Sequence, residues 1–595
     1  MSQGEGGGWQ GGPTTRPELT GTFGMVASSH WLASAAGMAM MEKGGNAFDA
    51  ASAAGFVLQV VEPHMSGPAG EAPILFSREG GPVRMLAGQG PAPAAATVER
   101  YRSEGFDMVP GTGPMAATVP AAFEAWMVLL RDHGTLGLSE VLAPALAYAT
   151  NGHPAAPLAA QAVAAMRELF LAEWESSAEA YLVNGDAPAP GSLYRLPLLA
   201  ATYGRILAEA EAEGGGREAV IERARTVWRS GFVAEAIDRF CRGALVLDSS
   251  GERHGGLLTG DDMARFEAPY EAPLTYDYHG YTLAKGGPWS QGPVALQQLA
   301  LLAGFDLSAM DPLGPDFVHT VVECAKLAFA DREKFYGDPD FAEVPMAVLL
   351  SEDYNAARRA LVSETASLEL RPGDVPGYGA KRMLMGDGAG SAAGAGEPGA
   401  ALASDTVHID AVDRFGNLVS ATPSGGWLHG SPAVPGLGFP LGTRAQMFWL
   451  DADHPNGLAP GKRPRTTLSP SLALRDGKPW LAFGTPGGDM QDQWPLHMFL
   501  RVVHHGCNLQ EAIELPQFET LHFPNSFWPR EAWPGHLGLE GRFPEATVAE
   551  LRRRGHRIEE GGAWSIGRMT AAARDGPFLR AAATPRFMQA YAAGR

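Results

Sequence analysis

The alternation of polar and apolar residues is clearest over residues 406–422. Thr406, His408 and Asp410 fall on one side of an extended chain, and the apolar residues between them fall on the other. Residues 413–417, Asp-Arg-Phe-Gly-Asn, are turn formers, and apolar positions resume at 418–422. The pattern predicts a β-hairpin whose first strand starts at Thr406.

Apolar residues elsewhere recur at helical spacing. The periodicity predicts helices over 31–43, 47–60 and 317–335, with mostly helical chain over 118–207. After residue 406, short strands at 471–475 and 480–484 are followed by helices at 494–504, 509–514 and 545–554. Strand segments at 23–27 and 72–76 complete the pattern, which predicts a layered α+β or α/β fold.

A low-complexity run precedes the hairpin. Residues 386–403 are mostly Gly and Ala, which bury too little apolar surface to become ordered. A flexible loop that leads directly into a strand beginning with Thr suggests a self-cleaving enzyme. Cleavage of the Asp405–Thr406 bond would place a free α-amine beside the Thr406 hydroxyl, which is a known way to activate a threonine nucleophile. Taken alone, Thr406 would be read as an ordinary strand residue.

The composition argues against several classes of protein. The 595-residue chain has a net charge of −20, which disfavours binding to nucleic acid or to anionic membranes. Three cysteines without a paired spacing predict neither a disulfide framework nor a zinc site. No apolar run is long enough to span a bilayer, and the Gly-rich start has no secretory pattern. We therefore expect a cytoplasmic protein without a metal or other cofactor.

Several blocks along the chain carry a family resemblance. They are residues 24–28 with 44–50, 113–119, 327–332, 405–408 with 413–417, 461–471, and 484–488 (Gly-Thr-Pro-Gly-Gly). In this order they resemble the gamma-glutamyltranspeptidase (glutathione hydrolase) family of N-terminal nucleophile hydrolases. The resemblance extends along nearly the whole chain.

The resemblance implies a four-layer αββα sandwich made of two chains after autoproteolysis. The expected division is a flexible N-terminus (1–20), a large subunit (21–405) ending in a processing loop from about residue 373, and a small catalytic subunit (406–595). Thr406 would form the acyl-enzyme, and Ser424 would orient it in place of a second family threonine. The backbone N–H groups of Gly487 and Gly488 would form the oxyanion hole, because adjacent glycines allow close approach of two amides.

The residues expected to bind substrate depart from the family pattern. Gln89 stands where an Arg usually binds the substrate α-carboxylate, and a neutral amide cannot form a charge-assisted bidentate pair. Gly426 replaces an Asn, and the segment at Arg444 lacks the carboxylate that holds the α-amine. Thr466 and Thr467 replace a Ser-Ser pair. A zwitterion without its partner charges pays a large desolvation cost.

These departures leave the substrate open. The family default is transfer of a γ-glutamyl group from glutathione-like donors to water or an amine. The alternative is the same chemistry on another acyl group: a dicarboxylic monoamide, an acylase substrate, or a biosynthetic intermediate cleaved at a C–C bond, with Arg444 facing an acidic group. An inactive scaffold is the third hypothesis. The expected partners are a small-molecule amide and the two subunits of one precursor, with a higher homo-oligomer left open.

Other motifs admit simpler interpretations. Ser424 alone could be a surface hydroxyl, and Gly487-Gly488 alone a plain turn. His408 is interpreted as a structural hydrogen-bonding residue rather than a catalyst. His319 and Glu323 share a helical face, but no third metal ligand is evident, so a core pair is favoured.

Overall fold

The computed structural model describes residues 12–385 and 406–595 and contains two large antiparallel sheets. The first has the order β21 (Tyr591–Gly594), β2 (Gly24–Ser28), β12 (Ile409–Asp413), β13 (Leu418–Ala421), β3 (Ile74–Ser77), β4 (Val83–Leu86), β9 (Tyr270–Glu271). The second has the order β1 (Leu19–Gly21), β20 (Phe578–Ala583), β19 (Thr570–Asp575), β15 (Lys478–Gly484), β14 (Ser471–Arg475), β11 (Tyr281–Lys285), β10 (Leu274–Tyr278).

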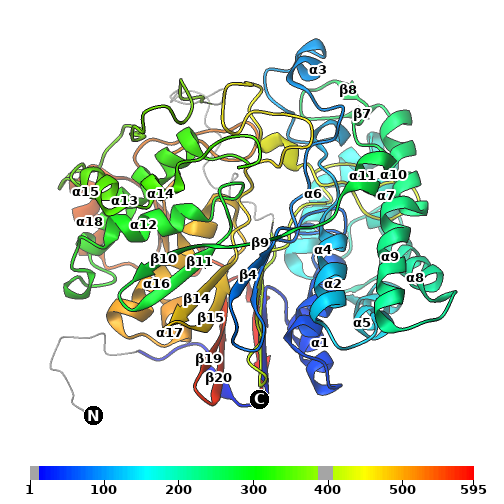
Figure 1. Cartoon of the computed structure of the whole chain (residues 1–595), viewed down its shortest axis with the longest axis horizontal. Helices are drawn as coiled ribbons and strands as arrows, with labels where there is room; N and C mark the ends of the chain where they lie inside the picture. The colour runs from blue at the N-terminus through cyan, green and yellow to red at the C-terminus, as the bar shows by residue number, and fades with distance from the viewer. Residues whose placement is uncertain (1–11, 386–405) are drawn as a thin grey trace.

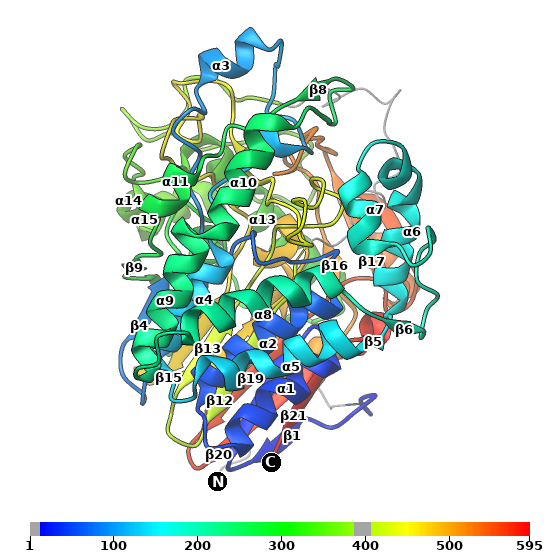
Figure 2. The same ribbon diagram turned by 90° about the vertical axis from the view of Figure 1, so that its right-hand side faces the viewer.

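The two sheets pack face to face between two layers of helices (Figure 1). The first sheet is covered by α1 (Trp31–Glu42), α2 (Ala47–Val61) and α5 (Leu138–Asn151), which cross in front of it in Figure 2. Three further helices, α4 (Ala122–His133), α8 (Pro197–Glu211) and α9 (Arg217–Ser230), pack against this helical layer. The second is covered by α12 (Pro293–Leu302), α13 (Pro315–Phe335), α16 (Trp494–His505) and α17 (Leu509–Glu514), with α18 (Glu545–Arg553) beside α13. This is the four-layer αββα sandwich that the family resemblance implies.

Small side chains bring these layers close together. The core between the sheets contains buried alanines at positions 27, 572 and 581. Helix α2 begins with a capping box formed by Asn46 and Asp49, which satisfies backbone donors at its start. A Cβ on Gly37 of α1 would lie 3.0 Å from the carbonyl oxygen of Ala50 in α2, so a larger residue there would require the two helices to move apart by a few tenths of an ångström. The predicted helices over 31–43 and 47–60 are confirmed to within one residue at each end.

The predicted hairpin is present as β12 and β13, with β12 between β2 and β13. The Asp413 carboxylate accepts hydrogen bonds from the backbone N–H groups of Phe415 and Asn417 and from the Asn417 amide. Gly416 has φ 91°, which the turn requires. Regular pairing starts at Ile409, so Thr406 precedes the strand proper and joins the sheet through an isolated bridge.

The structure describes only parts of the N-terminal segment (1–20) and of the predicted processing loop. Residues 1–20 are predicted to be flexible, but Thr15 donates two hydrogen bonds to the Glu514 carboxylate and β1 pairs with β20. The run 386–405 of the predicted processing loop lies outside the described residues. Among the helices that the structure describes, none has the length and apolarity needed to cross a membrane.

Candidate active site

Thr406 lies in the interior, at the end of the first sheet. Its backbone forms an antiparallel bridge with Ser424, and the neighbouring Val407 N–H donates to the Pro423 carbonyl at 3.0 Å. The Thr406 side chain is buried, and its Oγ1 lies 3.1 Å from the Ser424 Oγ. The structure therefore brings together the two hydroxyls that the sequence analysis paired. Asp405, the other side of the expected cleavage site, lies outside the described residues.

Arg444 is the next member of this arrangement. Its Nη2 donates to the Ser424 Oγ at 2.8 Å, while Nε and Nη2 both donate to Glu71 Oε2 at 3.2 and 3.1 Å. The Arg444 and Glu71 side chains are fully buried, and the guanidinium lies 4.8 Å from the centre of the Trp427 ring. Arg444 is a predicted substrate-binding residue, whereas Glu71 is not among the predicted site residues. In the structure, the charge of Arg444 is matched by a protein carboxylate.

This contact fixes one hydrogen bond of the Ser424 hydroxyl. A guanidinium can only donate, so Ser424 Oγ accepts from Arg444. A hydroxyl oxygen has a second lone pair as well as its proton, so either Thr406 or Ser424 can donate in the bond between the two hydroxyls. When Ser424 donates, the Thr406 oxygen is better able to carry the negative charge that develops when its own proton leaves.

The predicted glycine pair follows β15 in a conformation that needs glycine. Gly487 has φ 119° and Gly488 has φ 54°. A Cβ at Gly487 would lie 2.6 Å from the Trp494 ring, and one at Gly488 would lie 3.1 Å from the Phe527 ring. Neither amide N–H donates to another described residue. Two free backbone donors on a tightly confined loop can stabilise an oxyanion.

A buried ionic network anchors the loop that carries Gly487 and Gly488. Arg332 pairs with Asp489, which also accepts from the Ser526 backbone N–H at 2.8 Å and from its hydroxyl at 2.7 Å. Arg332 Nη1 donates to Gln291 Oε1 at 2.8 Å, and Gln291 Nε2 donates to the Gly488 carbonyl at 3.3 Å. None of these supporting residues is among the predicted site residues. They fix the peptide on the C-terminal side of Gly488.

His408 connects the end of the first sheet that carries Thr406 to the second sheet. Its ring nitrogens contact the Thr422 hydroxyl at 2.9 Å and Asp410 at 3.0 Å, and Asp410 in turn accepts from Thr570 at 2.7 Å. A Cβ on Gly484 would lie 2.3 Å from the His408 ring, so the end of β15 passes directly over it. Both ring nitrogens are engaged, which agrees with the structural role predicted for His408.

The remaining predicted substrate residues are all buried. Gln89 donates to the Gly90 carbonyl at 3.0 Å, and its Oε1 has no partner among the described residues. Gly426 has φ 65°. The Thr466 hydroxyl accepts from the Leu468 N–H at 3.4 Å, whereas the Thr467 hydroxyl has no partner in the described part of the chain.

The structure supplies a third residue beside the His319–Glu323 pair. His556 Nε2 lies 2.8 Å from His319 Nδ1, and the three residues lie close enough together to be considered for a metal. Glu323 already pairs with the ammonium of Lys326 at 2.6 Å and the guanidinium of Arg371 at 3.2 Å. Two cations on the one carboxylate oppose a third, so the cluster is best described as a hydrogen-bonded core network.

Comparisons with known proteins agree with this geometry. The sequence model of gamma-glutamyltranspeptidase matches residues 33–594. The glutathione hydrolase-like YwrD proenzyme of Bacillus subtilis (strain 168) is 31% identical over 577 residues, covering 96% of this chain and 98% of that protein. The oxamate amidohydrolase proenzyme of Klebsiella pneumoniae is 32% identical over 549 residues, covering 90% and 92%. The solved structure of LmbA2991HD superposes with a TM-score of 0.93 at 55% identity, covering 98% of this chain and 100% of that one.

The matches span both sheets, both helical layers and every residue of the site described above. The chain therefore belongs to the gamma-glutamyltranspeptidase family and is an amidohydrolase or acyltransferase of the N-terminal nucleophile class.

Proposed function

We propose that the chain cleaves itself between Asp405 and Thr406 and that the new N-terminal threonine is the nucleophile of an amidohydrolase. The observation that carries this proposal is the chain of contacts from Thr406 to Ser424 to Arg444. Cleavage would place the new α-amine beside the Thr406 hydroxyl, where it would take the hydroxyl proton. Ordinary strand residues do not need a fully buried guanidinium directed at their neighbour's hydroxyl.

The reaction follows from these roles. The Thr406 oxygen attacks the substrate carbonyl while its proton passes to the α-amine. The N–H groups of Gly487 and Gly488 hold the oxyanion of the tetrahedral intermediate. The C–N bond then breaks, the proton goes to the departing amine, and the acyl group stays on Thr406 as an ester. Water adds to that ester by the same steps and releases the acid, or an amine takes the acyl group instead.

We further propose that the acyl donor is not a γ-glutamyl group. Such a group carries a charged α-amine and α-carboxylate, and each needs a partner charge. Gln89 supplies no cation, and Arg444 and Glu71 neutralise each other. The relative named oxamate amidohydrolase supports a dicarboxylic monoamide as the substrate class. The relative named glutathione hydrolase-like keeps γ-glutamyl donors as the second candidate.

Intact mass of denatured wild type beside Thr406→Ala tests the nucleophile. We expect the wild type to give two fragments that meet between residues 405 and 406, and the variant to remain whole. An uncut wild type would overturn the proposal. The donor is tested with oxamate and γ-glutamyl-p-nitroanilide on wild type, Gln89→Arg and the neutral control Gln89→Met. We expect γ-glutamyl hydrolysis to appear only in Gln89→Arg; full γ-glutamyl activity in the wild type would favour the second candidate.

A further inference from the structure

A tryptophan and a buried glutamate lie next to the loop that carries Gly487 and Gly488, here called the oxyanion loop, and the reaction described above uses neither of them. Trp494 is the first residue of α16, and Glu519 is the last residue of β16 (Phe518–Glu519). Both side chains are buried, and the indole N–H of Trp494 donates to Glu519 Oε2 at 3.1 Å. Burying a carboxyl group costs free energy, so its presence here calls for an explanation.

The Trp494 indole contacts the oxyanion loop through its six-membered ring. A Cβ on Gly487 would lie 2.6 Å from Trp494 Cζ3 and 3.0 Å from Cη2, so the Gly487 Cα lies directly against this ring. The N–H of the five-membered ring is bound to Glu519 instead. The hydrogen bond that fixes one edge of the indole therefore also limits where the Gly487 peptide can lie. This matters because an oxyanion donor must stay about 3 Å from the atom on which charge develops.

A second contact keeps the two segments aligned. Gln493, which precedes Trp494, exchanges two hydrogen bonds with the backbone of Thr520, which follows Glu519. Its Nε2 donates to the Thr520 carbonyl at 3.1 Å, and its Oε1 accepts from the Thr520 N–H at 2.9 Å. Two consecutive residues at the start of α16 thus bind two consecutive residues at the end of β16, which sets the position of the Glu519 carboxyl group relative to the indole.

The surroundings of Glu519 hold its carboxyl group in the neutral form. No residue in the described part of the chain forms an ion pair with it. The titratable groups that face it from the neighbouring elements are His536 and Glu540 of β17 (His536–Glu540), Glu559 of β18 (Arg557–Gly561) and His497 of α16. Glu540 is paired with Arg586 and Glu559 with His536, so neither cationic partner is left for Glu519.

Burial raises the pKa of Glu519 to about 8, the Glu559 and Glu540 charges add to the rise, and the hydrogen bond from Trp494 opposes it. Burial also lowers the pKa of His497 well below its usual range, so no positive charge comes from that side at pH 7. Glu519 is therefore protonated at pH 7. It accepts the hydrogen bond of the indole without carrying a charge.

We propose that Glu519 is a positioning residue for the oxyanion loop and acts through the indole of Trp494. The inference rests on the proposed function, because the place of Gly487 matters only if the loop stabilises an oxyanion. A neutral acceptor suits this location, since a carboxylate close to the loop would repel the negative charge that develops on the substrate oxygen. Asp489 on the same loop has its charge matched by Arg332, whereas Glu519 has no cation and is kept neutral by burial.

The first test separates kcat from KM. The substrate is 4-nitrophenyl acetate, whose small acyl group makes few demands on the pocket, and Thr406→Ala gives the background rate. In Glu519→Leu and in Trp494→Phe, kcat should fall roughly tenfold, a part of the effect of losing a whole oxyanion donor, while KM stays within about twofold. Glu519→Gln keeps an acceptor for the indole and should restore most of kcat at pH 7. The double variant Glu519→Leu/Trp494→Phe should lose no more than the worse single variant, because both changes break one hydrogen bond.

Trp174→Phe is the matched control for the loss of an indole hydrogen bond. Trp174 is also buried, and its N–H donates to the Leu247 carbonyl at 3.1 Å, in the helices that cover the first sheet. Both kcat and KM should stay at their wild-type values in this variant.

The second test uses the charge of Glu519. Above about pH 8 the wild type carries a carboxylate next to the loop, whereas Glu519→Gln stays neutral. The ratio of kcat in Glu519→Gln to kcat in the wild type should therefore rise by at least roughly threefold from pH 7 to pH 9.5. Titration of the Thr406 α-amine occurs in both proteins, so it cancels in the ratio.

Wild-type kcat in both single variants, losses that multiply in the double variant, or a ratio that does not change with pH would each overturn the role of Glu519. An uncut wild type, or a cut wild type no faster than Thr406→Ala, would instead overturn the proposed function. Intact mass and the background rate distinguish these two failures.

Discussion

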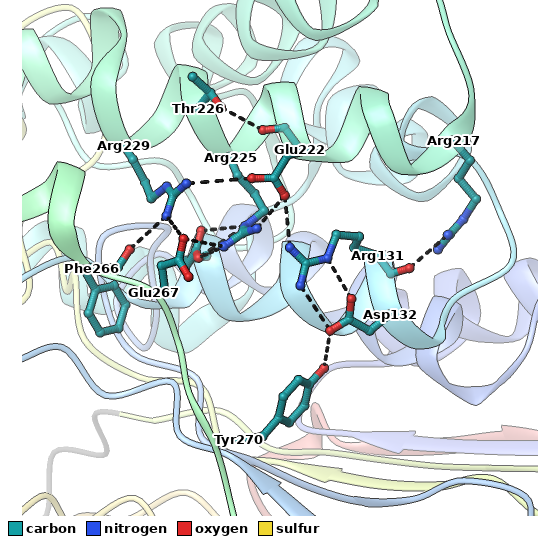
Figure 3. Close-up of polar contacts among 11 residues, drawn as sticks. Arg131, Asp132, Arg217, Glu222, Arg225, Thr226, Arg229, Phe266, Glu267 and Tyr270 are labelled. Atoms are coloured by element: carbon teal, nitrogen blue, oxygen red, sulfur yellow. Dashed lines mark hydrogen bonds and ion pairs between the residues drawn. The ribbon is translucent and has the colours of Figure 1, made fainter.

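Two groups of buried and half-buried arginines in this molecule serve different purposes. The first lies between α4 and α9, where Arg131, Glu222 and Arg225 form a chain of ion pairs (Figure 3). Several of its members reach solvent; the Glu222 side chain is 44% exposed. The second is the Arg444–Glu71 pair beside Ser424 and the proposed nucleophile Thr406, where both side chains are 0% exposed.

The two regions differ in how many alternative partners each charged group has. In the helical network Glu222 pairs with both Arg131 and Arg225, and water reaches it, so the loss of one contact is absorbed by others. Arg444 has one carboxylate, one hydroxyl and two aromatic faces around it. Burying a charge confined in this way costs much free energy, and its few partners hold the guanidinium in one orientation. In the first region several ion pairs share the contribution to stability, whereas in the second the ion pair fixes the positions of the hydrogen-bonding atoms.

The largest expected effect breaks the second region. Arg444→Met leaves the Glu71 carboxylate buried without its cation, which should lower the free energy of unfolding by about 3–5 kcal/mol. Urea unfolding measures this loss. The double variant Arg444→Met/Glu71→Gln removes both charges, so it should recover most of the stability but not the turnover. A single variant as stable as the wild type would show that the pair is not needed to hold the site.

A smaller effect is expected at the oxyanion loop. In Gly488→Ala the new methyl group lies 3.1 Å from Phe527 at a φ of 54°, which shifts the donor N–H. We expect kcat to fall roughly 100-fold, the scale of losing one oxyanion donor. Gly576→Ala is the matched control, because Gly576 has φ 61° with no atom near the new Cβ. Equal activity in the two variants would show that the Gly488 amide takes no part in the reaction.

Glu62 shows the cost of burying a carboxylate. Burial raises its pKa from 4.5 to about 7. The folded state therefore holds the proton more tightly, and stability should fall as pH rises from about 4.5 to about 7 and then level off. At about 1.4 kcal/mol per pKa unit, Glu62→Gln should remove a loss on the order of 2–3 kcal/mol. Thermal unfolding of both proteins at pH 5 and pH 8 tests this; a constant difference between them would contradict it.

The smallest effect is expected in the network of Figure 3. Arg131→Gln removes the pairs with Asp132 and Glu222, but Glu222 keeps Arg225 and Asp132 keeps Tyr270. The free energy of unfolding should fall by no more than about 1 kcal/mol, as is usual for half-exposed pairs. Urea unfolding at low and high salt measures the change, which salt should reduce. A loss as large as that of Arg444→Met would remove the distinction between the two regions.

The sequence predicted local features well and long-range pairs poorly. The hairpin at 409–421 and the start of α2 are set by neighbouring residues, so alternation and capping reveal them. Thr406 stood out through the Gly/Ala-rich run and the hairpin that follows it, and Ser424 and the glycine pair through the family blocks. Glu71 did not, because it lies in a Gly/Pro-rich loop and its partner Arg444 is 373 positions away. The partner of His319 was missed for the same reason, since His556 is 237 positions away.

The order of strands in the two sheets has a consequence for the molecule that the proposed cleavage would produce. In the first sheet, β12 and β13 are inserted between β2 and β3, and β21 lies outside β2; in the second, β1 borders β20 while β10 and β11 extend from β14. Segments from both sides of residue 406 thus alternate within each sheet. Two fragments woven together in this way cannot separate as folded bodies. Their dissociation and their unfolding would be one event, so the nicked protein should melt as a single cooperative unit, at a temperature that falls on dilution because the transition releases two fragments.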